Sequence, residues 1–221
     1  MAQNGLSTKI CGLSDSAAIA AAVDGGARFI GLVFYPPSPR SVSPERAGEL
    51  VQTVPPDIFR VGVFVDPDDE LLDSVFARLR LDFVQLHGSE SPARAAEIKT
   101  RTGAGIIKAI KLAAPADVAS AESYCTVADW ILFDAKAPQT RAGALPGGNA
   151  LAFDWRMLAE QSELIGGLPW LLSGGLHIDN LAKAVRISGA RSVDVSSGVE
   201  SAPGMKNPEL VRRFLALGAT L

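Results

Sequence analysis

A thiol and a carboxylate in this chain each stand at the end of a short apolar run, where a side chain could take part in chemistry. Cys11 closes the run 8–11 (TKIC) ahead of a glycine, and Asp134 closes the run 129–134 (DWILFD). A carboxyl group that is partly desolvated at such a position favours its protonated form, as a general acid must. The plain alternatives are a small buried side chain for Cys11 and a helix cap or salt bridge for Asp134. These two residues are the candidate reactive pair.

Two neighbouring loops later in the chain have the composition of a phosphate site. Glycines let backbone N–H groups approach an anion closely, and a helix N-terminus adds a favourable dipole. The candidate residues are Gly174 and Gly175 in the first loop and Asp194, Ser196, Ser197 and Gly198 in the second. A pair of tight turns that need glycine is the alternative. The serines in both loops favour phosphate binding.

Other polar residues near strand ends give weaker signals. Arg40 lies in the proline-stiffened segment 35–42 (YPPSPRSV), where a rigid guanidinium suits a carboxylate and a solvated arginine is the alternative. His87 could be an acid or base, but its glycine neighbour and the polar run after it fit a plain loop. His177 starts a helix and Cys125 lies in a helical stretch, so both are expected to be structural. With two histidines in no metal-binding spacing, no metal site is expected.

The elements that must position these residues alternate along the whole chain. Nearly continuous apolar runs predict strands buried on both faces of a parallel sheet, and helical patterns separate them. The predicted strands are 8–11, 28–34, 60–65, 82–87, 106–111, 129–134, 169–173 and 192–195. The predicted helices are 15–24, 44–53, 68–79, 91–102, 115–124, 153–163, 178–188 and 207–217. Capping residues are expected at Ser14 or Asp15, Ser43-Pro44, Asp66-Pro67, Ser91-Pro92 and Asn207-Pro208.

Eight strand–helix units in 221 residues predict a single-domain (βα)8 barrel of the α/β class spanning residues 1–221. A doubly wound open sheet is the alternative, but residues 11–16 lack the glycine-rich first turn of that fold. In a barrel the candidate residues gather at the carboxyl ends of the strands. The loop 135–152, rich in Gly, Ala and Pro, then lies beside Asp134 and is expected to cover the site.

Composition limits the possible partners and compartments. A net charge of −3 gives no electrostatic argument for nucleic acid or an anionic membrane. No apolar run approaches membrane-spanning length, and the start of the chain lacks a signal-peptide pattern. Two cysteines in such a chain are expected to be free thiols. We therefore expect a cytoplasmic protein, and its modest charge favours a monomer.

Motifs in order along the chain together resemble the phosphoribosylanthranilate isomerase family, the (βα)8-barrel enzymes of tryptophan biosynthesis. They are KICGL at 9–13, GLVFYPPSPRSV at 31–42, VGVFVD at 61–66, VQLHGSE at 84–90, LFDAK at 132–136, GGN at 147–149, FDW at 153–155, LSGGL at 172–176 and DVSSGVE at 194–200. Any one of them is a weak signal, whereas the ordered set is highly specific.

The resemblance implies an Amadori rearrangement of N-(5′-phosphoribosyl)anthranilate to 1-(2-carboxyphenylamino)-1-deoxyribulose 5-phosphate. Asp134 matches the general acid that opens the ribose ring, and Cys11 matches the general base that removes the C2′ proton. Arg40 matches a residue near the anthranilate group, and the two glycine loops match the phosphate site, with Asp194 close to the sugar. The expected partner is therefore a small-molecule substrate. Proton transfer of this kind needs no metal or redox cofactor. Lys9 is a candidate for stabilising the Cys11 thiolate.

The chain departs from the family pattern in its loops. Ala150 follows Gly147-Gly148-Asn149 where the family commonly has a third glycine, and the family often has a threonine or arginine near the position of Ser14. Both changes concern loop geometry and leave the acid and the base in place. The rival functions are another sugar-phosphate isomerase or epimerase barrel and a non-catalytic barrel that binds a sugar phosphate.

Overall fold

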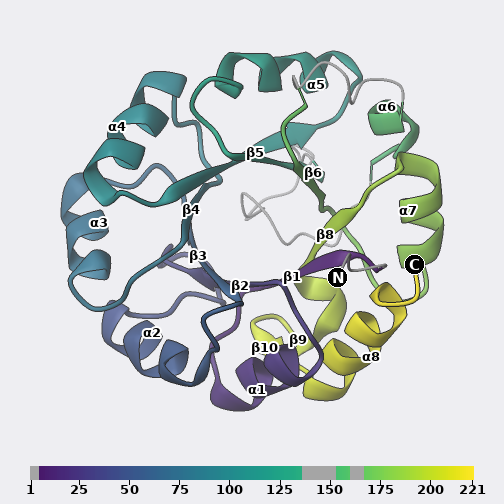
Figure 1. The fold of residues 1–221 in the computed structure, drawn as a ribbon, viewed down its shortest axis with the longest axis horizontal. Helices are drawn as coiled ribbons and strands as arrows, with labels where there is room; N and C mark the ends of the chain where they lie inside the picture. The colour runs from purple at the N-terminus through teal and green to yellow at the C-terminus, as the bar shows by residue number, and fades with distance from the viewer. Residues whose placement is uncertain (1–4, 136–152, 160–166) are drawn as a thin grey trace.

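The structure is a computed structural model that describes residues 5–135, 153–159 and 167–221. Eight parallel strands close into a barrel in the order β1 to β8, and the helices form a ring outside it (Figure 1). The strands are β1 (Ser7–Cys11), β2 (Phe29–Val33), β3 (Phe59–Phe64), β4 (Phe83–Leu86), β5 (Gly105–Leu112), β6 (Trp130–Ala135), β7 (Trp170–Leu172) and β8 (Ser192–Val195). This confirms the predicted barrel and excludes the doubly wound sheet.

Alternate residues of each strand point into the barrel because side chains in a strand alternate between its two faces. The outward residues pack with the helices in one large apolar core, which includes Ile10, Ile30 and Val84. The inward residues form a separate apolar cluster that includes Phe29, Ile107 and Leu132. The two clusters explain why the strands are nearly continuous in apolar residues.

Aromatic rings fill the amino-terminal end of the barrel interior. Phe29, Phe59, Phe83 and Trp130 each begin a strand, and the ring centroids of Phe29 lie 5.2 Å from Phe59 and 5.3 Å from Trp130. Edge-to-face and tilted contacts at this spacing are favourable beyond the area they bury. Because these rings fill the amino-terminal end of the barrel, polar chemistry is left to the carboxyl ends of the strands.

The helices cover the barrel and cap their own ends. They are α1 (Ser16–Asp24), α2 (Pro44–Leu50), α3 (Asp69–Phe76), α4 (Pro92–Thr102), α5 (Ala116–Ala119), α6 (Arg156–Ala159), α7 (Leu181–Ser188) and α8 (Pro208–Gly218). Asp15, Ser43, Ser91 and Asn207 cap their helices as predicted. The cap of α3 is Asp68 and not Asp66, whose φ of 46° places it in the preceding turn.

Several predicted helices are shorter in the structure. The stretches 44–53 and 115–124 each end as a 3-10 helix, η1 (Val51–Thr53) and η2 (Ser120–Tyr124). Of the predicted helix 153–163, residues 156–159 are helical and residues 160–163 lie outside the described residues. The predicted covering loop also lies outside them beyond Ala135.

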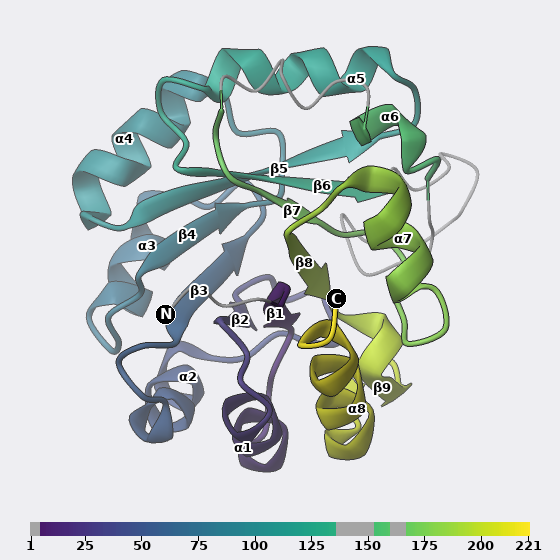
Figure 2. The ribbon, with the colours of Figure 1, turned by 45° about the vertical axis from the view of Figure 1, so that its right-hand side comes forward.

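A short hairpin that the sequence analysis did not predict follows β8. A 3-10 helix, η4 (Ser197–Val199), leads into the antiparallel strands β9 (Glu200–Ala202) and β10 (Met205–Lys206). The 3-10 helix η4 contacts α8, and α8 packs beside α1 where the ring of helices closes (Figures 1 and 2).

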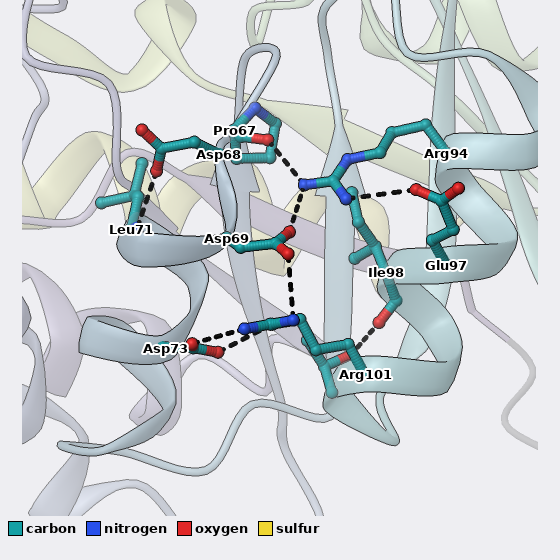
Figure 3. Close-up of polar contacts among 10 residues, drawn as sticks. Pro67, Asp68, Asp69, Leu71, Asp73, Arg94, Glu97, Ile98 and Arg101 are labelled. Carbon is teal, nitrogen blue, oxygen red and sulfur yellow. Dashed lines mark hydrogen bonds and ion pairs between the residues drawn. The ribbon is translucent and has the colours of Figure 1, made fainter.

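The outer surface between α3 and α4 carries a network of ion pairs (Figure 3). Arg94 contacts Asp69 at 2.7 Å, and Arg101 contacts both Asp69 at 2.9 Å and Asp73 at 2.6 Å. Because these side chains are largely exposed, solvent screens the pairs and they contribute little to stability. The network links two neighbouring helices on the outside of the barrel and is separate from the polar strand ends.

Within the described residues, no helix is both long and apolar enough to cross a membrane.

Candidate active site

The predicted site residues, except Gly198, line one pocket at the carboxyl end of the barrel. The pocket opens to solvent at this end and is lined by both apolar and polar side chains. Its lining includes Cys11, Arg40, Asp134, Gly174, Gly175, Asp194, Ser196 and Ser197. The structure thus brings the ends of strands β1, β6, β7 and β8 together around one pocket, as the barrel prediction required.

Cys11 lies beside a buried ion pair at the bottom of the pocket. Lys9 donates to Asp194 Oδ1 at 2.7 Å from the directly paired position on β8, and Ser173 donates to Asp194 Oδ2 at 2.9 Å. Gly31 on β2 leaves room for both the thiol and the ammonium group, since a Cβ there would lie 3.0 Å from Cys11 Sγ and 3.2 Å from Lys9 Nζ. The thiol is therefore close to a cation that is itself fixed by a carboxylate.

Burial and the neighbouring charges shift the pKa of the Cys11 thiol in opposite directions. Burial raises the pKa of the Cys11 thiol, and the charges of Lys9 and Lys206 offset this effect only in part. Burial alone would lower the pKa of Lys9, but Asp194 and Cys11 outweigh it and the pKa of Lys9 is raised. Lys9 stays charged and favours the thiolate, as predicted, but it does not bring the thiol pKa below its ordinary value.

Asp134 is held from two sides at the end of β6. Its Oδ1 accepts the N–H of Ala135 at 2.9 Å, and its Oδ2 lies 3.1 Å from His87 Nε2. His87 Nδ1 lies 2.9 Å from the side-chain nitrogen of Gln85. All three side chains are buried, so the carboxylate is fixed in the pocket wall and does not cap a helix.

The expectation that His87 belongs to a plain loop was wrong. The residue directly follows β4, and its side chain continues the inward series of Phe83 and Gln85. The predicted strand 82–87 already ended at His87, so its alternation would have placed this residue in the site. By contrast, His177 is half exposed and lies outside the pocket, with Nδ1 3.5 Å from Asp179.

The two glycine loops pack against each other and against Asp134. Gly174 has a φ of 85°, and a Cβ there would lie 2.7 Å from the Ala135 nitrogen. A Cβ at Gly198 would collide with the carbonyl oxygen of Leu176. Among the described residues, the N–H groups of Gly174 and Gly175 donate to no acceptor. Both loops therefore need glycine for their packing. The N–H groups of Gly174 and Gly175 remain available as donors beside the pocket.

Arg40 reaches the pocket, but a carboxylate of the protein itself already binds it. Its Nε and Nη2 donate to Glu200 at 2.7 and 2.9 Å, the bidentate geometry expected for a carboxylate partner. Lys206 donates to the same carboxylate at 2.6 Å and to the carbonyl oxygen of Ser196 at 3.1 Å. Burial would raise the pKa of Glu200, but Arg40 and Lys206 outweigh it and the pKa is lowered. This cluster fixes Arg40 and connects it to the loop after β8.

Three contributors to the site were not predicted from the sequence, namely Gln85, Glu200 and Lys206, and His87 was assigned to a plain loop. Strand alternation was a usable signal for Gln85 and His87. Ser173 belongs to the predicted phosphate loop, but its hydroxyl donates to Asp194. Nothing in the sequence indicated that Lys206, beyond a short hairpin, would return to Ser196. Cys11 and Cys125 are both free thiols, and Cys125 lies in the helical layer with Sγ 3.6 Å from the carbonyl oxygen of Ala121.

The chain is similar to one protein family over nearly its whole length. The sequence profile of the family described as N-(5'phosphoribosyl)anthranilate (PRA) isomerase matches residues 8–216. A relative named N-(5'-phosphoribosyl)anthranilate isomerase, from Paracoccus denitrificans, is 53% identical over 211 residues, 96% of each chain. A second, from Rhodospirillum centenum, is 53% identical over 213 residues, 96% of this chain and 98% of the relative.

Solved structures show the same similarity. Phosphoribosyl anthranilate isomerase from Thermotoga maritima has 34% identity and a TM-score of 0.85, over 98% of this chain and 100% of that one. A structure of phosphoribosyl anthranilate isomerase in complex with reduced 1-(o-carboxyphenylamino)-1-deoxyribulose 5-phosphate has 32% identity and a TM-score of 0.83, with the same coverage.

Proposed function

Because this chain belongs to the N-(5′-phosphoribosyl)anthranilate isomerase family and is an isomerase of tryptophan biosynthesis, we propose that Cys11 is its general base and Asp134 its general acid. The observation that carries this proposal is their placement in one pocket, on β1 and β6, with the glycine loops of β7 and β8 between them. The non-catalytic barrel and the other sugar-phosphate enzymes are set aside by the family membership.

The phosphate of the substrate binds between the two glycine loops. The N–H groups of Gly174 and Gly175 point to no acceptor among the described residues, and Ser196 and Ser197 line the same pocket. Backbone donors of this kind bind phosphate without a fixed positive side chain. Gly198 supports the site by allowing its loop to approach Leu176. A phosphate held here places the sugar between Cys11 and Asp134, with Asp194 alongside.

The two reactive groups then divide the proton transfers. Asp134 protonates the ring oxygen of the ribose and opens the ring to a Schiff base. Cys11, as the thiolate, removes the C2′ proton, and the resulting enolamine converts to the ketone. Burial raises the pKa of Cys11, so the ammonium group of Lys9 is needed to stabilise the thiolate when it forms.

The anthranilate group lies on the opposite side of the sugar from the phosphate. The pocket wall there is apolar, formed by Val33, Val63 and Tyr35 next to Cys11. Arg40 borders this wall and supplies positive charge for the substrate carboxylate, while Glu200 fixes the orientation of its guanidinium. An apolar surface with one oriented cation suits a benzoate group.

The roles of Cys11 and Asp134 are tested by following the loss of anthranilate-type fluorescence when phosphoribosylanthranilate is converted. Cys11→Ser and Asp134→Asn are each expected to lower kcat by at least about a hundredfold, as for the loss of a general acid or base. Cys125→Ser is the matched control, because it removes a thiol outside the pocket and should retain full activity. Wild-type activity in either pocket variant would refute the role assigned to that residue.

We further propose that the chain acts as one catalytic domain, as a monomer, in the cytoplasm. The described elements from Ser7 to Gly218 belong to one barrel and its helices. Among the described residues, the exposed large apolar side chains are Met205 and Leu221. An obligate interface would expose more apolar surface than these two side chains provide. Both cysteines are free thiols, as is usual in a reducing compartment. Light scattering coupled to size exclusion tests the monomer, and a mass near twice 23.1 kDa would refute it.

A further inference from the structure

Gln85 is a buried amide inside the barrel, and among the described residues its side chain makes a single hydrogen bond. It lies on the inward face of β4, is 1% exposed, and pairs in register with Val63 and Ile107 on the neighbouring strands. Its nitrogen Nε2 bonds with His87 Nδ1 at 2.9 Å, whereas Oε1 has no hydrogen-bond partner among the described residues. A buried polar atom without a partner disfavours folding. An apolar residue would suit this position better unless the bond to His87 has a function.

This bond determines which nitrogen of His87 carries the proton. A neutral imidazole has one N–H and one acceptor nitrogen, and an amide nitrogen can only donate. Because Gln85 donates to Nδ1, the ring proton must be on Nε2. That N–H faces Asp134 Oδ2 at 3.1 Å and donates to it, while Ala135 N–H donates to Oδ1 at 2.9 Å. Both oxygens of the carboxylate are then held by directed donors.

We propose that Gln85 is a positioning residue that acts through His87: it selects the Nε2–H form of the ring, which in turn orients Asp134 toward the substrate. The proposal rests on the role of Asp134 as general acid. A general acid is protonated before it reacts. If the ring carried its proton on Nδ1, the Nε2 lone pair would accept the O–H of Asp134 and turn that proton toward His87, away from the ribose oxygen. After the proton transfer, the same lone pair would repel the ionised carboxylate, and Asp134 would keep only the Ala135 donor.

The chain offers a direct spectroscopic test, since its two histidines are His87 and His177. In protein labelled with ¹⁵N in the histidine rings, each tautomer gives a distinct pair of nitrogen shifts. We expect His87 in the Nε2–H form in the otherwise wild-type protein, with His177→Asn identifying the second set of signals. Gln85→Met keeps the size of the side chain and removes the donor. In this variant His87 is expected to populate the Nδ1–H form.

Gln85→Glu gives an independent second variant if Gln85→Met does not fold. The carboxylate that it introduces can accept but not donate, so His87 should appear with Nδ1 protonated. An unchanged Nε2–H form in either folded variant would overturn the proposal, because the ring would then be set by other contacts.

Kinetics separate positioning from packing. In Gln85→Met we expect kcat to fall about tenfold to a hundredfold with KM changed less than about twofold, because orientation of the acid is lost and substrate binding is not. A changed tautomer with wild-type kcat would overturn the positioning role. Full activity in Asp134→Asn would instead refute the acid role itself, and the histidine spectra would still report whether Gln85 selects the tautomer.

Discussion

Replacing Lys9 with methionine should strongly reduce the reactivity of Cys11 by removing a buried positive charge beside the thiol. A Cβ placed at Gly31 would lie 3.0 Å from Cys11 Sγ and 3.2 Å from Lys9 Nζ. The sulfur and the nitrogen are therefore at most about 6.2 Å apart. At that separation, and with an effective dielectric constant of about 20, the attraction between thiolate and ammonium is about 3 kcal/mol. Its loss corresponds to roughly a hundredfold less thiolate at a fixed pH.

The assay is the rate of alkylation of Cys11 by iodoacetamide as a function of pH, in a Cys125→Ser background so that one thiol reacts. Lys9→Met should shift the rise in alkylation rate to higher pH, since burial already raises the pKa of this thiol and Lys9 opposes that effect. If Cys11 is the base, kcat should fall in parallel and recover as pH increases.

Lys9→Met will also destabilise the protein, because Asp194 is left as a buried carboxylate without its ion-pair partner. Removing one member of a buried pair typically costs about 3–5 kcal/mol. Lys108→Met is the matched control: Lys108 pairs with Glu90 at 2.7 Å and both side chains are buried, but the pair lies between β5 and the loop after β4. It should lower stability similarly and leave the Cys11 titration unchanged. An identical alkylation profile for Lys9→Met and its parent would refute the electrostatic argument.

Two further predictions concern the residues around the pocket. Glu200→Gln should raise KM about tenfold by loosening Arg40, with a smaller change in kcat; an unchanged KM would contradict the role of Glu200 in fixing that guanidinium. Because the folded-state pKa of Glu200 is lowered, its contribution to stability is complete above the unfolded pKa of about 4.3 and is lost as pH falls through the folded pKa. Wild type should therefore lose more stability than Glu200→Gln on acidification below about pH 4, as denaturant unfolding would measure. Gly174 has a φ of 85°, and the Cβ of Gly174→Ala would lie 2.7 Å from the Ala135 nitrogen. This variant should displace the loop that faces Asp134 and reduce kcat/KM at least about tenfold. Gly189→Ala is the control: its φ is 71° but its Cβ meets no neighbour, so it should have backbone strain alone and keep its activity.

The barrel could be predicted because its evidence is local. Strands buried on both faces are continuous apolar runs, such as that ending at Asp134, and capped helical patterns such as the one after Ser91 separate them. The order of these elements allows few topologies, and in a barrel every strand end is at the same rim. Cys11, Asp134 and the glycine loops were therefore located in one pocket from the sequence.

The contacts that decide how those residues behave depend on the tertiary structure. Lys9 meets Asp194 across 185 positions of sequence, and Arg40 meets Glu200 across 160. No local pattern encodes such pairs, because they follow from the register between β1 and β8 and from a hairpin that returns Lys206 to the rim. The sequence alone determined that a thiol and a carboxyl group face one pocket. Only the closed barrel decided that the thiol is buried beside a fixed cation and that the carboxylate is held by His87, because burial and charge separation are properties of the packed structure.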